Sequence, residues 1–197
     1  MHIQLVETKF QIEGTSPLVT NNQLQIKNAE KIWCEAGYFL NRLYVIKGVM
    51  PKSKEDGTYN LSRVDNFIKT AQFGFPLVAF QHAFTQAAKW TDFTLQQIKQ
   101  SLLLTSDYGE LACLTASPPI VDSRRMEWTK KDFNVVRPMF KEWATEFVVK
   151  YDKTRFSTEQ VEEIINIAGR EIGVGEERKQ RSELAWGAFK VTSHKNI

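Results

Sequence analysis

The sequence contains little cysteine and little histidine, which limits the chemistry that it can carry. Cys34 and Cys113 are far apart, and neither has a second Cys or a His at the spacing of zinc ligands. Both lie among apolar residues, as free buried thiols of a reducing compartment do. Two of the three histidines, His2 and His194, lie near the ends, and His82 falls beside the apolar face of an expected helix as a partly buried or capping residue. We therefore expect no metal site and no cofactor.

Long hydrophobic runs are also missing. No apolar run approaches the ~18 residues that a membrane-spanning helix needs, and the opening MHIQLVETKF lacks the apolar segment of a signal peptide. We expect a soluble protein of the cytoplasm with no membrane partner.

Several enzyme motifs are absent. The chain has no G-x-S-x-G nucleophile turn and no G-x-x-x-x-G-K-[ST] phosphate loop. The Gly173-Val-Gly175 sequence follows an expected helix, whereas a dinucleotide-binding fingerprint precedes one. The acids Asp122, Glu127 and Asp132 alternate with bases, which is typical of ion-pair partners. We expect a protein that is not an enzyme, although a metal-dependent nuclease that uses Asp and Glu stays an alternative.

Length and charge indicate one mildly basic globular domain. The 197 residues fit a single domain at ~100–200 residues each. The 26 basic and 23 acidic residues leave a net charge of +3, with a pI near 8.8. Such a charge permits a polyanionic partner without requiring one.

The hydrophobic pattern predicts an α+β fold. A first strand is expected over 2–12, with a bulge across 6–8. A helix that begins near Pro76 buries an apolar face, and a capping box at Ser157–Gln160 begins another helix. A final strand is expected over 186–191. The order strand, insertion, helix, two strands, helix, strand predicts a ferredoxin-like or RRM-like antiparallel sheet with two backing helices.

Two segments interrupt this order. We expect an inserted lobe over about 20–70, which contains the polar stretch PKSKEDGTYN. We expect an extended hairpin or arm over about 121–142. Together with the core they form one domain over 1–197.

The arm mixes bases with aromatic side chains. It contains six basic residues and four acidic residues. Arginine and lysine bind phosphates, and aromatic faces stack unpaired bases at about 1–3 kcal/mol each. A solvated hairpin is the alternative interpretation. The candidate nucleic-acid-binding residues of the arm are Arg124, Arg125, Trp128, Lys130, Lys131, Phe133 and Arg137.

A second basic segment follows the last helix, in the loop that we call the late loop, residues 173–188. A glycine-rich turn allows the backbone to approach a polyanion closely. The candidates here are Gly173, Gly175, Arg178, Lys179 and Arg181. A helix C-cap followed by a solvated loop is the alternative.

Three motifs, quoted as they stand here, carry a resemblance. They are Gly14-Thr15-Ser16-Pro17-Leu18, Arg137-Pro138-Met139-Phe140-Lys141-Glu142-Trp143, and Ala168-Gly169 with Gly173-Val174-Gly175 and Gly187-Ala188-Phe189-Lys190-Val191. The chain resembles a bacteriophage protein family of similar length, related to the RAMP superfamily (repeat-associated mysterious proteins) of RRM-like CRISPR subunits. Its late loop is longer and more acidic than a plain glycine-rich loop of that superfamily.

The resemblance implies an RRM-like sheet and nucleic-acid binding without catalysis. The expected partner is single-stranded RNA or DNA, with several copies of the chain, or a multi-subunit complex, assembled along the strand. The expected location is then the cytoplasm of the host cell. The alternative is a phage structural or assembly protein that acts through protein–protein contacts.

Overall fold

A seven-stranded antiparallel sheet forms the centre of the molecule. The computed structural model describes residues 3–22, 35–128 and 131–197, without the side chains of 125–128 and 131–134. The strands lie in the order β10-β1-β9-β6-β4-β3, and β5 also pairs with β9. Their bounds are β1 Leu5–Gly14, β3 Val45–Lys47, β4 Gln72–Pro76, β5 Leu103–Thr105, β6 Leu111–Ala116, β9 Trp143–Asp152 and β10 Phe189–Asn196.

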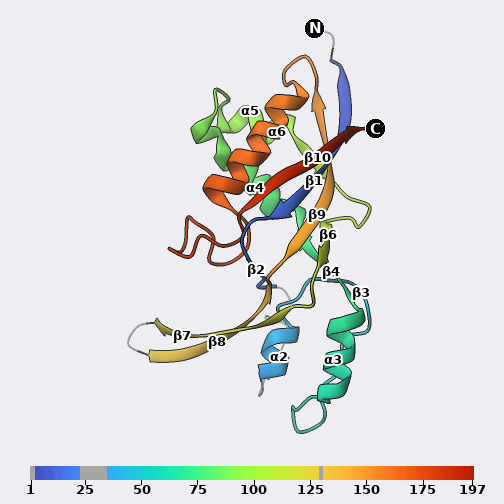
Figure 1. Ribbon diagram of the computed structural model, residues 1–197, viewed down its shortest axis with the longest axis vertical. Helices are drawn as coiled ribbons and strands as arrows, with labels where there is room; N and C mark the ends of the chain where they lie inside the picture. Colours follow the sequence, from blue (N-terminus) through green and yellow to red (C-terminus); the bar gives the residue numbers. More distant parts are fainter. Residues whose placement is uncertain (1–2, 23–34, 129–130) are drawn as a thin grey trace.

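The connections between these strands are those of a ferredoxin-like fold. The chain runs β1, α4 (Leu77–Ala87), β6, β9, α6 (Thr158–Ile167), β10. The two strands from the ends of this sequence, β1 and β10, are neighbours, and β9 lies between β1 and β6. Both helices cover the same face of the sheet (Figure 1). The α+β, ferredoxin-like or RRM-like class expected from the sequence is confirmed.

Local sequence explains where the two helices begin. Pro76, with φ −61°, precedes the first turn of α4, where its missing N–H is not needed. Ser157 and Gln160 form the expected capping box before α6. That helix continues into the π-helical segment η2 (Ala168–Ile172), which ends at Gly173 with φ +73°. A positive φ of this size favours glycine, so the sequence marks the end of the helix.

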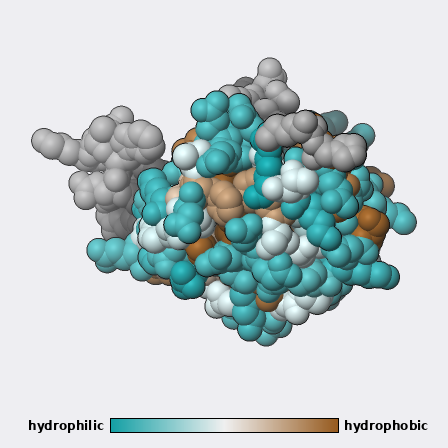
Figure 2. All heavy atoms as spheres, turned by 90° about the horizontal axis from the view of Figure 1, so that it is seen from above, coloured by the Kyte–Doolittle hydropathy of each residue, from teal (hydrophilic) through white to brown (hydrophobic). Residues whose placement is uncertain are grey.

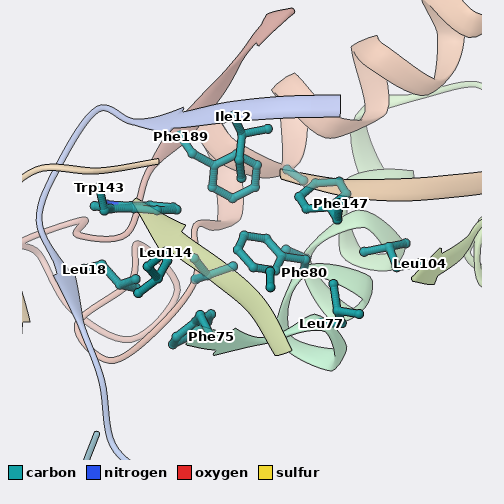
Figure 3. Packing of buried hydrophobic residues seen from close by; sticks show 14 of the residues in the cluster. Ile12, Leu18, Phe75, Leu77, Phe80, Leu104, Leu114, Trp143, Phe147 and Phe189 are labelled. Atoms are coloured by element: carbon teal, nitrogen blue, oxygen red, sulfur yellow. The ribbon is translucent and has the colours of Figure 1, made fainter. Parts of the chain in front are cut away.

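Aromatic rings from distant strands meet in the core. Phe80 of α4 is fully buried, with ring centroids of Phe75, Phe147 and Phe189 at 5.8, 5.4 and 5.8 Å (Figure 3). These partners belong to β4, β9 and β10. Tilted and edge-on contacts at these distances are favourable beyond the buried area. Through this one side chain the helix therefore contacts strands from β10 at one edge of the sheet to β4 near the other.

Two details of the edge strands differ from the expectation. Strand β1 pairs with β9 without a break, and the register shift lies between Gln11 and Ile12, against β10, so the bulge expected across 6–8 is wrong. The last strand begins at Phe189 and not at residue 186. Gly187 lies before it with φ +70°, and a Cβ there would be 1.7 Å from the Val174 carbonyl oxygen, so both the backbone conformation and the close contact require glycine.

The segment between β2 (Leu18–Val19) and β4 lies at one end of the molecule. Its described part contains α2 (Glu35–Leu40), β3 and α3 (Leu61–Thr70). Strand β3 joins this segment to the main sheet through β4. Figure 1 shows α2 and α3 below the sheet, on the same side as the arm.

The arm is a long hairpin of β7 (Ile120–Trp128) and β8 (Lys131–Phe140). Strand β2 pairs with β8, which makes a second sheet in the order β2-β8-β7. The hairpin projects away from the main sheet (Figure 1). Its base is therefore held by β2, which comes directly after the turn that follows β1.

The remaining elements lie between α4 and β6. They are the 3-10 helix η1 (Ala88–Trp90), α5 (Leu95–Ser101) and β5. Figure 2 shows one end of the molecule, where hydrophilic residues surround a small hollow of apolar atoms. Isolated apolar patches of this kind are normal on a soluble protein.

Candidate nucleic-acid interface

The three sequence motifs behind the resemblance meet at one junction. The indole Nε1 of Trp143 donates to the Ser16 carbonyl at 2.9 Å. The Ser16 hydroxyl accepts from the backbone N–H of Ala188 at 2.9 Å, and the N–H of Gly187 donates to the Pro17 carbonyl at 2.7 Å. The turn after β1 is thus held between the base of the arm and the end of the late loop.

Glycine in the late loop allows its backbone to lie directly against another segment of the chain. A Cβ on Gly175, where φ is +82°, would lie 2.6 Å from the Val19 carbonyl oxygen. The N–H of Glu176 donates to that same oxygen at 3.0 Å. Gly173 ends the helix, with its N–H bonded to the Ala168 carbonyl at 2.9 Å. Both predicted glycines therefore have a structural role, and for Gly173 that role is the helix cap.

Arg137 connects the arm to the late loop. Its guanidinium lies 2.8 Å from Asp122 on β7 and 2.6 Å from Glu177 in the late loop. The residue is only 3% exposed. Two carboxylates therefore pair with the guanidinium group that we predicted to bind phosphate. Asp122 is an ion-pair partner, as expected.

Glu177 is held in an unusual position. Its φ is +57°, in the left-handed region that residues with a side chain seldom adopt. Burial would raise the pKa of its carboxyl group, but hydrogen bonds from Arg137 and Ser182 outweigh this, so the pKa lies below its usual range. The charged form of Glu177 is the one that this site stabilises.

Arg124 forms a second link between the arm and the late loop. Its Nε lies 2.8 Å from Asp122, and its guanidinium carbon lies 4.3 Å from the centroid of the Trp186 ring. The Trp186 backbone N–H donates to the Glu177 carbonyl at 2.9 Å. The sequence pattern did not identify Trp186 or Glu177 as site residues. Their contacts with Arg124 and Arg137 form only when the late loop packs against the arm.

The other cations of the late loop are nearer to solvent. Lys179 lies 2.7 Å from Glu171, and Arg181 lies 3.7 Å from Glu176. Arg178 donates from Nη1 to the Gly175 carbonyl at 2.9 Å. Burial lowers the pKa of Arg178, and the nearby positive charge of Arg181 lowers it further. Two guanidinium groups thus share this side of the loop.

Five of the predicted residues are not described at the level of side chains. They are Arg125, Trp128, Lys130, Lys131 and Phe133, and Lys130 lies wholly outside the described residues. The backbone of the hairpin is described up to the pair Trp128 and Lys131. The part of the candidate interface that the structure describes therefore consists of Arg124, Arg137 and the late loop.

The open face of the sheet differs from that of an RNA-binding RRM, in which aromatic side chains stack bases. Its outward positions on β1, β6 and β9 carry no aromatic residue over the described lengths of these strands. Lys9 pairs with Glu146 at 3.0 Å, and Lys150 pairs with Glu7 at 2.8 Å. The lysines that β1 and β9 place on this face are thus each paired with a carboxylate.

Metal ligands do not gather in the described part of the chain. No group of three or more His, Cys, Asp or Glu there could hold a metal ion. His82 is exposed on α4, so its expected partial burial is wrong. His194 lies 3.0 Å from Glu162 of α6. Over the described residues, no helix has the length and apolar character needed to cross a membrane.

Comparison with known proteins gives a structural likeness but no family. No protein-family model matches the sequence, and no curated protein matches it. The crystal structure of Cmr6 from Pyrococcus furiosus is similar to this chain at 12% sequence identity and a TM-score of 0.39. The match covers 96% of this chain and 100% of the other. At this score no residue of that protein can be transferred to this chain.

Proposed function

We propose that this chain is a non-enzymatic protein that binds single-stranded nucleic acid at the surface shared by the arm and the late loop. The observation that carries the proposal is the double contact of Arg137 with Asp122 and Glu177, at 2.8 and 2.6 Å. It holds two basic segments, far apart in the sequence, beside each other.

In this proposal Arg137 connects the arm to the late loop and does not bind phosphate. Its two carboxylate partners leave its charge compensated inside the protein. The phosphate contacts then come from the basic residues of the arm other than Arg137, and from Arg178, Lys179 and Arg181 of the late loop. Arg124 and Trp186 form a cation–π pair at the boundary between the two groups.

Fluorescence anisotropy with labelled single-stranded DNA and RNA tests the proposal. Counterion release predicts that the logarithm of the affinity falls linearly with the logarithm of the salt concentration, by about 0.7 for each phosphate contacted. Unchanged anisotropy at low salt would rule the proposal out. Cleavage of the probe that stops on addition of a chelator would instead show a metal-dependent nuclease.

Assembly through protein–protein contacts is the second candidate. Leu61, the first residue of α3, is 69% exposed. Exposed apolar side chains of this kind can serve contacts between copies or with an assembly partner. Size-exclusion chromatography with light scattering, before and after nuclease treatment, separates the two candidates. Oligomers that survive nuclease and absorb little at 260 nm favour assembly, whereas copies held together by a strand separate.

A further inference from the structure

A groove runs between the late loop and the start of α4, and we call it the α4 groove. Its first part has a volume of about 490 Å³ and is lined by Arg178, Arg181, Tyr44 and Val78, among others. Its second part has a volume of about 850 Å³ and shares Tyr44 and Val78 with the first. Each part has the size of a typical small-ligand site, about 300–1,000 Å³.

The end of the groove at the late loop is positive. Arg178 and Arg181 both line it, and Glu176 is the one carboxylate beside them among the described lining residues. A guanidinium carries five N–H groups, and the described residues supply a single hydrogen-bond acceptor to Arg178, the Gly175 carbonyl. Two guanidinium groups near one carboxylate leave an excess of positive charge that an anion can neutralise.

The beginning of α4 opens into the same space. Val78 and Ala79, in the first turn of this helix, line the positive end. No side chain caps the first turn, because Pro76 stands at the N-cap position. Backbone N–H groups and the positive end of the helix dipole favour an anion there, which adds to the effect of the two arginines.

The other end of the groove is apolar. Leu77 and Leu104 line it and lie at the edge of the core (Figure 3). Of the described residues around this part, Glu110 is the only charged one. A phosphate would be repelled there. Leu77 and Leu104 are only 7% and 8% exposed, so a flat base would contact the apolar floor that they form and would bury apolar area mainly on Val78, which is 72% exposed. Tyr44 stands between the two ends and offers an aromatic ring at the passage.

We propose that the α4 groove holds one nucleotide of a bound single strand, with its phosphate at Arg178 and Arg181 and its base in the apolar part beside Leu77 and Leu104. This inference rests on the proposed function, since it names where on the protein one nucleotide of the strand is bound. The order of the two ends sets the direction of the nucleotide: the phosphate faces the late loop and the base faces the turn before β6.

A charge placed at the mouth of the groove tests the inference without disturbing the core. Val78 is 72% exposed, so Val78→Glu adds a carboxylate where the phosphate would enter. We expect it to weaken binding of a labelled oligo(dT) of about 12 nucleotides by roughly tenfold at low salt. Val49→Glu is the matched control, because Val49 is 89% exposed and lines a different cavity, beside α3. It should bind as the unchanged protein does.

The two arginines are tested through the salt dependence of binding. If they share one phosphate, Arg178→Gln with Arg181→Gln lowers the slope of log affinity against log salt by about 0.7, and not by twice that amount. Arg63→Gln on α3 should leave the slope unchanged. An oligonucleotide of equal length in which abasic sites replace the bases should bind more weakly, and equal binding would overturn the assignment of the base.

The outcomes separate this inference from the proposed function. Thermal unfolding first shows whether each variant folds. Salt-dependent binding by the unchanged protein, together with equal binding by folded Val78→Glu and by the double arginine variant, overturns the groove and leaves the proposed function intact. Absence of any binding by the unchanged protein overturns both. Loss of binding in both groove variants, with the Val49→Glu and Arg63→Gln controls unaffected, supports the groove.

Discussion

Arg137 of β8 and Glu177 of the late loop, 40 positions apart in the sequence, form an ion pair with a separation of 2.6 Å. Asp122 completes this cluster from β7, at 2.8 Å from the same guanidinium. The cluster joins two segments that otherwise meet through the turn after β1 and through the contact of Arg124 with Trp186. Its removal should therefore affect both stability and the surface that we propose for nucleic acid.

Removal of the Arg137 charge should destabilise the protein strongly. Arg137→Met removes the ion-pair partner of Glu177 and one of the two arginine partners of the buried Asp122, and breaking a buried pair costs about 3–5 kcal/mol. Urea unfolding measures the loss in the free energy of unfolding. Arg63→Met on α3 serves as the control and should change it by less than about 0.5 kcal/mol. If Arg137→Met were as stable as the unchanged protein but bound no strand, Arg137 would be a direct ligand.

Acid should weaken the attachment of the late loop to the arm, because it protonates Glu177. The folded protein holds the pKa of this carboxyl below its usual range, so the charged form contributes stability above the unfolded pKa of about 4.3. That contribution is lost as the pH falls through the lower, folded pKa. We expect the difference in stability between the unchanged protein and Glu177→Gln to be constant from about pH 7 to pH 5 and to shrink below about pH 4. Urea unfolding at a series of pH values measures it, and a difference that persists unchanged at about pH 3 contradicts the assignment.

Two glycines with nearly the same φ should respond differently to alanine. Gly187 and Gly109 have φ of +70° and +69°. A Cβ on Gly187 would lie 1.7 Å from the Val174 carbonyl oxygen, whereas a Cβ on Gly109 would meet nothing within 4 Å. Gly109→Ala should cost about 1–2 kcal/mol from the backbone alone, and Gly187→Ala should cost more than about 3 kcal/mol. Equal melting temperatures for the two variants would show that the late loop does not pack closely against Gly187.

Arg124 and Trp186 should be energetically coupled. Their cation–π contact, at 4.3 Å, is partly exposed, for which about 0.5–1 kcal/mol is expected. A double-mutant cycle of Arg124→Gln and Trp186→Leu in urea isolates this coupling. A cycle of Lys150→Gln and Trp186→Leu, with Lys150 paired to Glu7, provides the comparison and should show none. Zero coupling in the first cycle would mean that the two side chains do not hold the arm and the loop together.

Shortening of Phe80 should cost about 3–5 kcal/mol, because Phe80→Ala leaves a cavity among three other rings. Val78→Ala, two positions earlier on α4 and largely exposed, should change the stability by less than about 0.5 kcal/mol. Thermal unfolding compares the two. A small effect at Phe80 would show that the surrounding strands can close the space.

The regular elements could be predicted because their signals are local. The apolar spacing that places Phe80 and Phe84 on one face of α4, the capping box at Ser157 and the left-handed turn at Gly173 each depend on a few neighbouring residues. The register shift of β1 could not be predicted in the same way. It lies at Gln11 and Ile12, because it is set by β10 at the other end of the chain.

Composition, the order of strands and helices and the mild positive charge follow from the sequence by itself, because hydrophobic periodicity and capping act over short distances. Which charges face solvent was decided by the tertiary structure alone. Arg137 and Arg178 are both arginines in basic segments, yet Arg137 meets two carboxylates inside the protein and Arg178 lines a groove. The difference arises because the partners of a charged side chain are set by the packing of segments that are distant in the chain.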